Sequence, residues 1–319
     1  MNLNLNLPIK RVGVIGYGKT GMLHVEAIQE VNNVELLGIV GRNPLRLKQY
    51  ALERNIDYFF DLKTFYESVA PDYLVICLPI LEIKAILEEA LQYPWAILVE
   101  KPLGLNYEEN SKLLDKIRVN NSKVNVGMNR RMLSSTLTLN KYLEPDHGPR
   151  RIQIVDQQDT QMARKLGFSK KVIENWHQAN SIHMFDLGLN FTRGNLIDLQ
   201  EYPVDRKVVN EFRYLLKFES GDLLEYYSVW NKEKQWSAKI MTGPHVYELK
   251  PIEKLKILCS CCNSKATDLP CYLEPTHIKP GFYNQISAFL GNRLDLEKYM
   301  CSPEQANFAS GVLKRIYGS

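Results

Sequence analysis

The segment that most constrains the fold is a glycine-rich turn between an apolar strand and a helix. Arg11–Ile15 (RVGVI) has the pattern of a buried strand, and Thr20–Val31 has the pattern of a helix. The residues that join them, Gly16–Gly21 (GYGKTG), form a G-x-G-x-x-G sequence. In this context the first glycine makes the tight turn, the second lets a pyrophosphate approach, and the third lets the helix pack on the strand. The turn predicts a dinucleotide-binding βαβ unit; the alternative is a glycine-rich turn of structural use alone.

The chain up to residue 127 repeats this alternation of short apolar strands and amphipathic helices. Further strands are expected at Val34–Val40, Tyr73–Leu78, Ala96–Val99 and Lys123–Val126. One helix can start at Asn43-Pro44, and another is expected from about Glu82 to Gln92. Continuous runs of Val, Ile and Leu between helices are typical of a parallel sheet covered on both faces. Residues 1–127 are therefore predicted to form a doubly wound α/β domain of the Rossmann type that binds NAD(P).

After residue 127 the strands become longer and alternate between apolar and polar residues. They are expected at Arg151–Asp156, Phe212–Phe218, Leu223–Trp230 and Trp236–Met241, with a hairpin turn at Ser220-Gly221. Helices are expected at Ser135–Tyr142, Asn180–Phe191, Phe282–Leu290 and Pro303–Ile316. Residues 128–319 are therefore predicted to form an α+β domain with a mostly antiparallel sheet.

Charge and cysteine usage exclude several classes of protein. The 319 residues include 40 basic and 36 acidic ones, and the resulting charge of +4 is too small to indicate nucleic acid as the main partner. No apolar run approaches the roughly 20 residues of a membrane span, so no membrane partner and a cytoplasmic location are expected. Four of the six cysteines cluster without two C-x-x-C pairs, which favours reduced thiols over a metal site: Cys259, Cys261, Cys262 and Cys271.

The end of the second strand indicates which dinucleotide is bound. NAD-binding domains usually carry an acidic residue about 20 residues after the last glycine, where it binds the ribose hydroxyls. This chain has Gly41 there, followed by Arg42. A guanidinium without a neighbouring carboxylate suits a 2′-phosphate and favours NADP(H). NAD(H) is the alternative, with Arg42 as a solvated loop charge.

Four segments together carry a resemblance to a known family. They are Val12–Gly21 (VGVIGYGKTG), Leu98–Leu103 (LVEKPL), Val126–Arg131 (VGMNRR) and Ser181–Leu187 (SIHMFDL). In this order and spacing the chain resembles the glucose–fructose oxidoreductase / inositol dehydrogenase (Gfo/Idh/MocA) family over almost its full length. The resemblance implies a Rossmann domain followed by an open-faced antiparallel sheet. It also implies that residues 128–319 bind the substrate and form a large sheet, through whose open face the chain makes a homodimer or homotetramer.

The resemblance also implies an acid–base pair. Lys101 and His183 match the family's catalytic lysine and histidine. Hydride transfer from a carbinol carbon needs a base for the hydroxyl proton. Lys101 follows a parallel strand at the edge where such sheets bind ligands, and an imidazole exchanges protons near neutral pH. Asp186, one turn after His183, could orient it or bind a substrate hydroxyl. Taken alone, each residue also fits a structural role.

The remaining predicted contacts follow from the same resemblance and from side-chain chemistry. Dinucleotide contacts are expected at Gly16, Tyr17, Gly18, Lys19, Thr20, Gly21, Gly41, Arg42, Leu78, Pro79, Glu100 and Lys101. Substrate contacts are expected at Arg131, Trp176, Asn180, Asp186, Trp230 and Tyr283. Aromatic rings can stack on sugar faces, and a guanidinium can bind a carboxylate or phosphate. The alternative is that these residues are core or solvated charge.

Two departures from the family pattern affect the expected substrate. Ala179 and Ile83 stand where many members have an aspartate and a histidine, so the proton relay is either shorter or supplied by Asn180 or Gln178. The favoured function is NAD(P)-dependent oxidation or reduction of a sugar, nucleotide sugar or cyclitol. The alternatives are a reductase of a tetrapyrrole, imine or diol, and a non-catalytic dinucleotide sensor. The presence of both Lys101 and His183 argues against a sensor.

Overall fold

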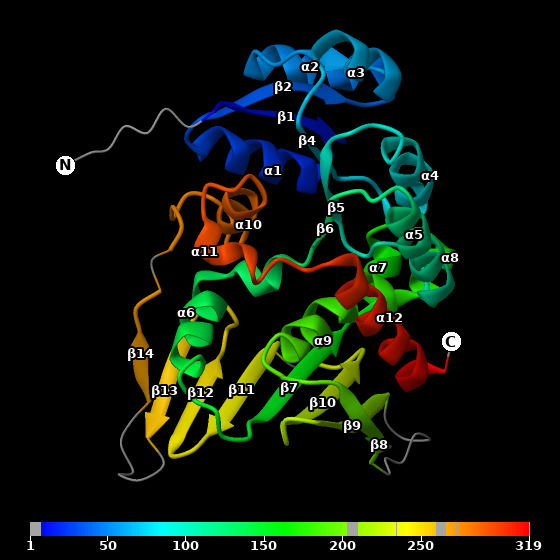
Figure 1. The fold of residues 1–319 in the computed structure, drawn as a ribbon. Helices are drawn as coiled ribbons and strands as arrows, with labels where there is room; N and C mark the ends of the chain where they lie inside the picture. Colours follow the sequence, from blue (N-terminus) through cyan, green and yellow to red (C-terminus); the bar gives the residue numbers. More distant parts are fainter. Residues whose placement is uncertain (1–7, 203–209, 234, 260–265, 272, 319) are drawn as a thin grey trace, which may run out of the picture. The chain divides into compact units, whose positions relative to one another are not determined.

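The computed structural model describes residues 8–202, 210–233, 235–259, 266–271 and 273–318 (Figure 1). The chain divides into two compact units. The first, called here the Rossmann unit, consists of Met1–Gly104, Glu108–Gly127 and Pro275–Gln305. The second, the large-sheet unit, consists of Leu105–Tyr107, Met128–Glu274 and Ala306–Ser319.

The Rossmann unit is built on a six-stranded parallel sheet in the order β3-β2-β1-β4-β5-β6. Its strands are β1 (Lys10–Ile15), β2 (Val34–Val40), β3 (Tyr58–Phe59), β4 (Tyr73–Ile76), β5 (Ala96–Glu100) and β6 (Val124–Gly127). Side chains such as Val14, Val75 and Leu98 are fully buried, as expected for central parallel strands. The strand order reverses between β1 and β4, so the carboxyl ends of these strands form the crevice where such sheets bind ligands.

The helices of this unit come from both ends of the chain. Those that follow the strands are α1 (Lys19–Glu30), α2 (Pro44–Arg54), α3 (Leu62–Val69), α4 (Ile80–Ala90) and α5 (Tyr107–Val119). Two further helices, α10 (Phe282–Phe289) and α11 (Leu294–Glu297), come from the C-terminal part. In α10 the Phe282 ring lies edge-on to His24 of α1, with ring centroids 4.9 Å apart. The C-terminal return therefore completes the packing around α1.

The large-sheet unit has eight strands in the order β14-β13-β12-β11-β7-β10-β9-β8. Their bounds are β7 (Arg151–Gln158), β8 (Leu196–Glu201), β9 (Glu211–Phe218), β10 (Leu223–Trp230), β11 (Ser237–Thr242), β12 (His245–Leu249), β13 (Leu255–Cys259) and β14 (Thr267–Leu269). All pairs are antiparallel except β7 with β10. Along β7 buried residues alternate with less buried ones, so one face of the sheet packs against helices.

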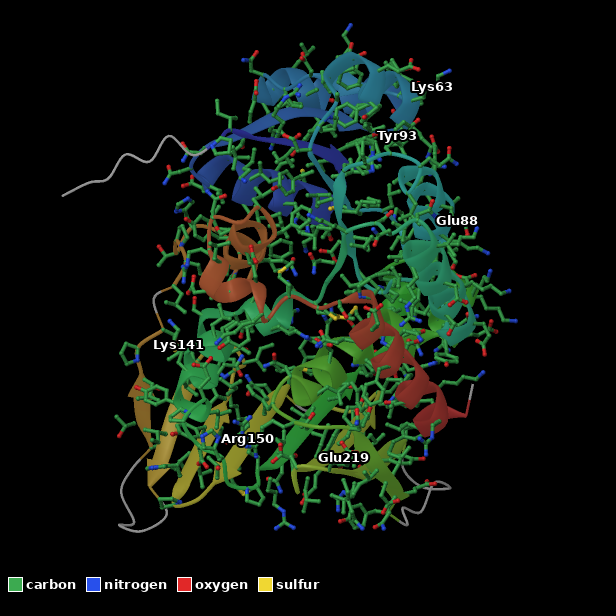
Figure 2. The ribbon with its side chains drawn as sticks, viewed as in Figure 1. Lys63, Glu88, Tyr93, Lys141, Arg150 and Glu219 are labelled. Atoms are coloured by element: carbon green, nitrogen blue, oxygen red, sulfur yellow. The ribbon has the colours of Figure 1, made fainter. Side chains whose placement is uncertain are left out.

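The helices of the large-sheet unit lie on one face of this sheet (Figure 1). They are α6 (Ser134–Leu143), α7 (Thr160–Lys165), α8 (Lys170–Glu174), α9 (Ile182–Leu189) and α12 (Pro303–Tyr317), with short turns η1 (Asn129–Met132) and η2 (His177–Ser181). The side chain of Arg150 (Figure 2) donates to the carbonyls of Leu143 and Phe191 at 2.8 and 3.0 Å. Because these carbonyls lie at the ends of α6 and α9, one guanidinium satisfies both helix termini and helps to fix α9.

The predicted fold class is confirmed: a parallel Rossmann sheet and a second, mostly antiparallel sheet are both present. The Ser220-Gly221 turn joins β9 to β10, with Gly221 at a φ of 84°. The predicted strand at Trp236 begins one residue later, at Ser237. The chain passes from the Rossmann unit to the large-sheet unit after Gly127. Residues Pro275–Gln305 belong to the Rossmann unit again, so the two units are not separated by a single boundary at that position.

Candidate functional site

The glycine turn between β1 and α1 leaves an open surface at the start of the helix. A Cβ atom on Gly16, which has a φ of 91°, would lie 2.2 Å from the carbonyl oxygen of Cys77. One on Gly21 would lie 2.0 Å from the carbonyl oxygen of Gly16. Around Gly18 there is no atom within 4 Å of such a Cβ. Helix α1 has no side-chain cap and no acidic residue in its first turn. This arrangement fits an anion placed over the turn.

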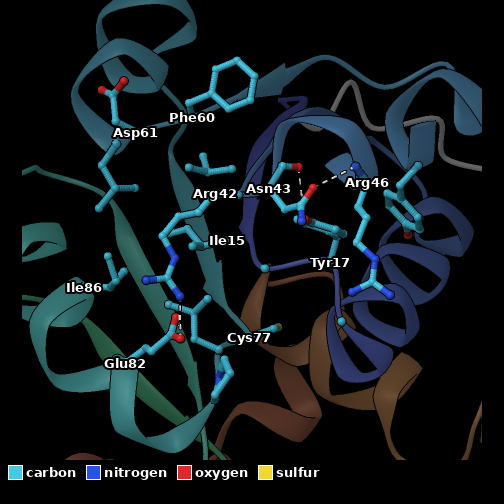
Figure 3. Close-up of a pocket in the computed structure, with 18 of the residues that line it drawn as sticks. Ile15, Tyr17, Arg42, Asn43, Arg46, Phe60, Asp61, Cys77, Glu82 and Ile86 are labelled. Atoms are coloured by element: carbon cyan, nitrogen blue, oxygen red, sulfur yellow. Dashed lines mark hydrogen bonds and ion pairs between the residues drawn. The ribbon is translucent and has the colours of Figure 1, made fainter. Parts of the chain in front are cut away.

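A pocket of about 1010 Å³ lies over this turn, at the ends of β1, β2 and β4 (Figure 3). Eight of the predicted dinucleotide contacts line it: Gly16, Tyr17, Gly18, Lys19, Gly41, Arg42, Leu78 and Pro79. Four others are not among its described lining residues: Thr20, Gly21, Glu100 and Lys101. Glu100 instead accepts a hydrogen bond from the buried His24 at 2.8 Å, and Lys101 is half-buried just after β5.

Several lining residues were not expected from the sequence. Asn43 caps α2 through a side-chain oxygen that accepts from the backbone N–H of Arg46 at 3.1 Å, and its carbonyl accepts from Tyr17 Oη at 3.3 Å. Arg46 itself lines the pocket and forms no ion pair with any described residue (Figure 3). The signal for this wall was present in the sequence, because Asn43-Pro44 predicted the start of α2.

An ion pair joins two walls of the pocket. Arg42 Nη2, just after β2, lies 2.5 Å from Glu82 Oε1 in the first turn of α4 (Figure 3). The Arg42 side chain is 76% exposed and that of Glu82 is 32% exposed. Arg42, which the sequence predicted to have no carboxylate beside it, therefore pairs with a carboxylate from another helix. A Cβ on Gly41 would lie 2.3 Å from the Tyr17 ring, so this ring excludes any larger residue there.

In the large-sheet unit, α9 carries His183 and Asp186 on a buried face. Arg131 binds Asp186 through two hydrogen bonds of 2.8 and 2.7 Å, and both side chains are almost fully buried. His183 is 9% exposed, and its ring centroid lies 6.1 Å from that of Trp236. Arg131 and Asp186, both expected to contact substrate, are therefore joined to each other. Their ion pair fixes η1 against α9.

A buried polar network supports the turn η2, which precedes α9. Gln158 accepts hydrogen bonds from Trp176 Nε1 and Asn180 Nδ2, both at 2.8 Å, and donates to Asp156. The carboxylate of Asp156 also accepts from Tyr226 Oη at 2.6 Å. Burial raises the pKa of Asp156 to about 6. These contacts orient Trp176 and Asn180.

A second pocket of about 420 Å³ lies beside this turn, within the large-sheet unit. Trp176, Asn180 and Trp236 line it, together with Gln157, Asp159, Met162, Ala163, Leu166 and Gln235. The structure thus brings together two of the predicted substrate contacts and adds Trp236. It separates two others from this pocket: Trp230 packs on Phe212 and Tyr317, and Tyr283 lies on α10 of the Rossmann unit.

Comparison with known proteins places the N-terminal part of the chain in a family. Residues 10–128 match the model of the Gfo/Idh/MocA oxidoreductase family, described as an NAD-binding Rossmann fold. The match covers the parallel-sheet part of the chain and identifies it as an NAD-binding Rossmann fold of an oxidoreductase family. The uncharacterized oxidoreductase YrbE of Bacillus subtilis is 29% identical over 120 residues, which make up 37% of this chain and 35% of that protein. The sequence likeness thus spans about a third of that relative.

Solved structures share the fold over nearly the whole chain. A dehydrogenase from Chromobacterium violaceum has a TM-score of 0.81 at 16% identity, covering 98% of this chain and 95% of its own. UDP-N-acetylglucosamine 3-dehydrogenase GnnA from Acidithiobacillus ferrooxidans has a TM-score of 0.75 at 17% identity, covering 97% and 96%. An aldose-aldose oxidoreductase from Caulobacter crescentus has a TM-score of 0.76 at 15% identity, covering 97% of both chains. At these identities the likeness shows the fold.

The two departures from the family pattern have distinct surroundings. Ile83 is fully buried in α4, so a histidine is replaced by a core residue. Ala179 is half-buried in η2, next to Asn180. Gln178, the other residue expected to supply the relay, is fully buried and donates to the carbonyl of Ser310 at 3.0 Å. Of the two expected substitutes for the aspartate, Asn180 is therefore the one that lines a pocket.

Two further features concern metals and membranes. Among the described residues no group of three or more His, Cys, Asp or Glu side chains could hold a metal ion. Cys77 and Cys301 are buried and Cys271 is half-buried, whereas Cys261 and Cys262 lie outside the described residues. No helix in the described part of the chain has the length and apolar character needed to cross a membrane.

Proposed function

We propose that the protein is an NADP(H)-dependent oxidoreductase that transfers a hydride between nicotinamide and a hydroxyl or keto carbon of a sugar, nucleotide sugar or cyclitol. The observation that carries the proposal is the pocket over the open Gly18 turn, in a Rossmann domain of the Gfo/Idh/MocA family. The pocket fits a dinucleotide because the backbone is accessible at Gly18 and the start of α1 is uncapped.

The preference for NADP(H) over NAD(H) is supported by the charges on the pocket wall. Gly41 provides no carboxylate for the ribose hydroxyls, and the neighbouring Arg42 and Arg46 are both exposed in the pocket. A guanidinium forms strong, charge-assisted hydrogen bonds with a phosphate. The ribose 2′-phosphate of NADP(H) is therefore assigned to this part of the pocket.

Lys101 and His183 are assigned as the acid–base groups. The bound nicotinamide would supply or accept the hydride, while the protein moves the proton. In the direction of oxidation the Lys101 amine accepts the single hydroxyl proton of the substrate, in reduction it returns a proton to the keto oxygen, and His183 is its partner in this exchange. Support comes from the place of Lys101 at the carboxyl end of β5 and from the buried position of His183 on α9.

The sugar-like substrate is supported by the pocket beside η2. Trp176 and Trp236 offer two indole rings, and Asn180 offers an amide, a combination suited to a ring with several hydroxyls. Two structures of the same fold carry the names UDP-N-acetylglucosamine 3-dehydrogenase and aldose-aldose oxidoreductase. The residue Ala179 favours one other candidate, a reductase of a non-sugar substrate that needs a shorter proton relay. The uncovered face of the large sheet is assigned to contacts between copies of the chain.

Titration with NADPH and NADH, followed by nicotinamide fluorescence, tests the proposal first. The bound protein is then incubated with a panel of sugars, nucleotide sugars and cyclitols, and with imines and diols as the alternative class. Binding of NADPH together with turnover of one sugar-like compound is the expected result. Turnover of an imine or diol instead would favour the second candidate. Binding without any turnover would indicate a sensor, and failure to bind either dinucleotide would refute the proposal.

Replacement of Lys101 tests the assigned chemistry. Lys101→Ala is expected to keep its dissociation constant for NADPH and to lose about 10²- to 10⁴-fold in kcat, as for removal of a general acid–base group. Steady-state kinetics and fluorescence titration measure the two effects. Lys112→Ala, on the exposed face of α5, is a matched control because it removes the same charge from the same unit. Equal kcat values for the two variants would rule out the role of Lys101.

A further inference from the structure

The proposed function assigns the Arg42 guanidinium to the 2′-phosphate. In the ligand-free protein this guanidinium instead forms an ion pair with Glu82. The 2.5 Å contact is the one ion pair that joins two lining residues among those the structure describes. Glu82 lies in the first turn of α4, where the helix dipole favours a negative side chain. The carboxylate is therefore stably placed, and the exposed arginine turns toward it across the pocket.

Of the other acidic lining residues, Asp61 and Glu53 are held by their own helices, and Glu89 forms no ion pair with any described residue. Asp61 caps α3, where its carboxylate accepts from the backbone N–H and the hydroxyl of Thr64 at 2.8 and 3.0 Å. Glu53 accepts from Gln49 at 3.0 Å and lies 3.4 Å from Arg54. Among the described residues, Glu82 is therefore the acidic lining residue that forms an ion pair with an arginine of the pocket. Its carboxylate is the one that a ligand phosphate has to displace.

A 2′-phosphate and a 2′-hydroxyl meet this ion pair differently. The phosphate carries between one and two negative charges near neutral pH, so it repels the Glu82 carboxylate and competes for the same guanidinium. A ribose hydroxyl carries no charge and leaves the pair intact. Since an exposed ion pair contributes little to stability, a phosphate can displace Glu82 at a modest loss of affinity.

We propose that Glu82 is a specificity-determining residue, which competes with the 2′-phosphate for Arg42 and thereby reduces the preference for NADP(H) over NAD(H). The inference rests on the proposed dinucleotide site and concerns the strength of its selectivity. In the ligand-free protein Glu82 holds Arg42 across the pocket. On binding of NADP(H), Arg42 exchanges this carboxylate for the phosphate, whereas NAD(H) binds without the exchange.

The test compares dissociation constants of the full-length protein for NADPH and NADH, measured by nicotinamide fluorescence. Glu82→Gln is expected to bind NADPH about three- to tenfold more tightly than the wild type, with less than about a twofold change for NADH. Glu35→Gln, exposed near the start of β2 and outside the pocket lining, removes the same charge and is expected to change neither constant by more than about twofold. An equal change for both dinucleotides in Glu82→Gln would overturn the inference.

A double-mutant cycle with Arg42→Gln identifies the route of the effect. If Glu82 acts through Arg42, the gain in NADPH affinity from Glu82→Gln disappears in the Arg42→Gln background. A gain that persists there overturns the exchange, because the phosphate would then be bound by another group such as Arg46. Adenosine 2′,5′-bisphosphate, used as a competitor, gives the same comparison without nicotinamide. Failure of the wild type and Glu82→Gln to bind either dinucleotide would refute the proposed function and the inference together.

Discussion

Gly18 and Gly21 lie three residues apart in one turn and lack a side chain for different reasons. A methyl group on Gly21 would meet the backbone of Gly16, so this glycine is needed for packing of α1 on the turn. A methyl group on Gly18 would meet no protein atom and would project into open space. The backbone of Gly18 has a φ of −68°, which other residues also adopt. Gly18 is therefore free for ligand contact, and Gly21 is committed to the fold.

This difference predicts opposite outcomes for two equal substitutions. Gly18→Ala is expected to keep its free energy of unfolding within about 0.5 kcal/mol of the wild type, while its affinity for NADPH falls about tenfold or more because the methyl group fills the pyrophosphate site. Gly21→Ala is expected to lose about 1–3 kcal/mol of stability through the clash. Denaturant unfolding and fluorescence titration measure the two quantities. Tight NADPH binding by Gly18→Ala would contradict the proposed position of the pyrophosphate.

Single residues were predictable from sequence where a local rule acts. The glycines of the turn and the Asn43-Pro44 helix start follow from backbone chemistry that depends on adjacent residues. The pairing of Arg131 with Asp186 was not predictable, because the two residues are 55 positions apart. The sequence suggested substrate or solvent as the partner of Arg131, and His183 or substrate as the partner of Asp186. For the same reason Glu82 was not recognised as the partner of Arg42.

At the scale of elements, the turn η2 is held by one glutamine of strand β7. This turn has π-helical geometry and runs directly into α9, although the sequence predicted an uninterrupted helix from Asn180. Periodicity does not distinguish a π turn from an α-helix, since both keep one face buried. The side chains of Trp176, just before the turn, and Asn180, within it, both donate to Gln158 of β7.

Removal of this glutamine is expected to destabilise the unit. Gln158→Leu would leave Trp176 Nε1, Asn180 Nδ2 and one oxygen of Asp156 without their present partner, for a loss of about 2–4 kcal/mol. Gln153→Leu is the control: it lies on the same strand but is half-buried, and its hydrogen bond to Glu225 is partly solvated. Its expected loss is below about 1 kcal/mol. Equal unfolding midpoints in urea for the two variants would contradict the role of Gln158.

At the scale of the whole molecule, the sequence predicted both sheets but not the route of the chain between the units. Continuous apolar runs indicated the parallel strands, and alternation indicated the antiparallel ones. The pattern of α10 shows an amphipathic helix, but it does not say which sheet or helix its apolar face covers. Phe282 and Phe289 pack on His24 and Tyr73 of the Rossmann unit, more than 200 residues earlier in the chain. Such long-range choices depend on shape complementarity rather than local sequence.

Two buried groups of the large-sheet unit, Asp156 and His177, have pKa values shifted in opposite directions and therefore change its stability with pH in opposite ways. Burial raises the pKa of Asp156 from 3.8 to about 6, so its contribution to stability is complete below pH 4 and is lost as the pH rises through 6. Burial lowers the pKa of His177 from 6.5 to about 4, so its contribution is complete above pH 6.5 and is lost as the pH falls through 4. At 1.36 kcal/mol per pKa unit, each amounts to roughly 3 kcal/mol.

The pH ranges of the two shifts overlap, so the contributions of Asp156 and His177 to stability largely cancel in the wild type. Substitution of one residue is therefore expected to make the pH dependence caused by the other measurable. As the pH falls from 7 to 4, the wild type should gain roughly 3 kcal/mol of unfolding free energy relative to Asp156→Asn and lose a similar amount relative to His177→Gln. Urea unfolding followed by tryptophan fluorescence measures this, since Trp176, Trp230 and Trp236 all belong to the large-sheet unit. If the difference in unfolding free energy between wild type and variant does not change with pH, neither Asp156 nor His177 changes its pKa on folding. If the two differences change with pH in the same direction, the opposed pKa shifts are contradicted.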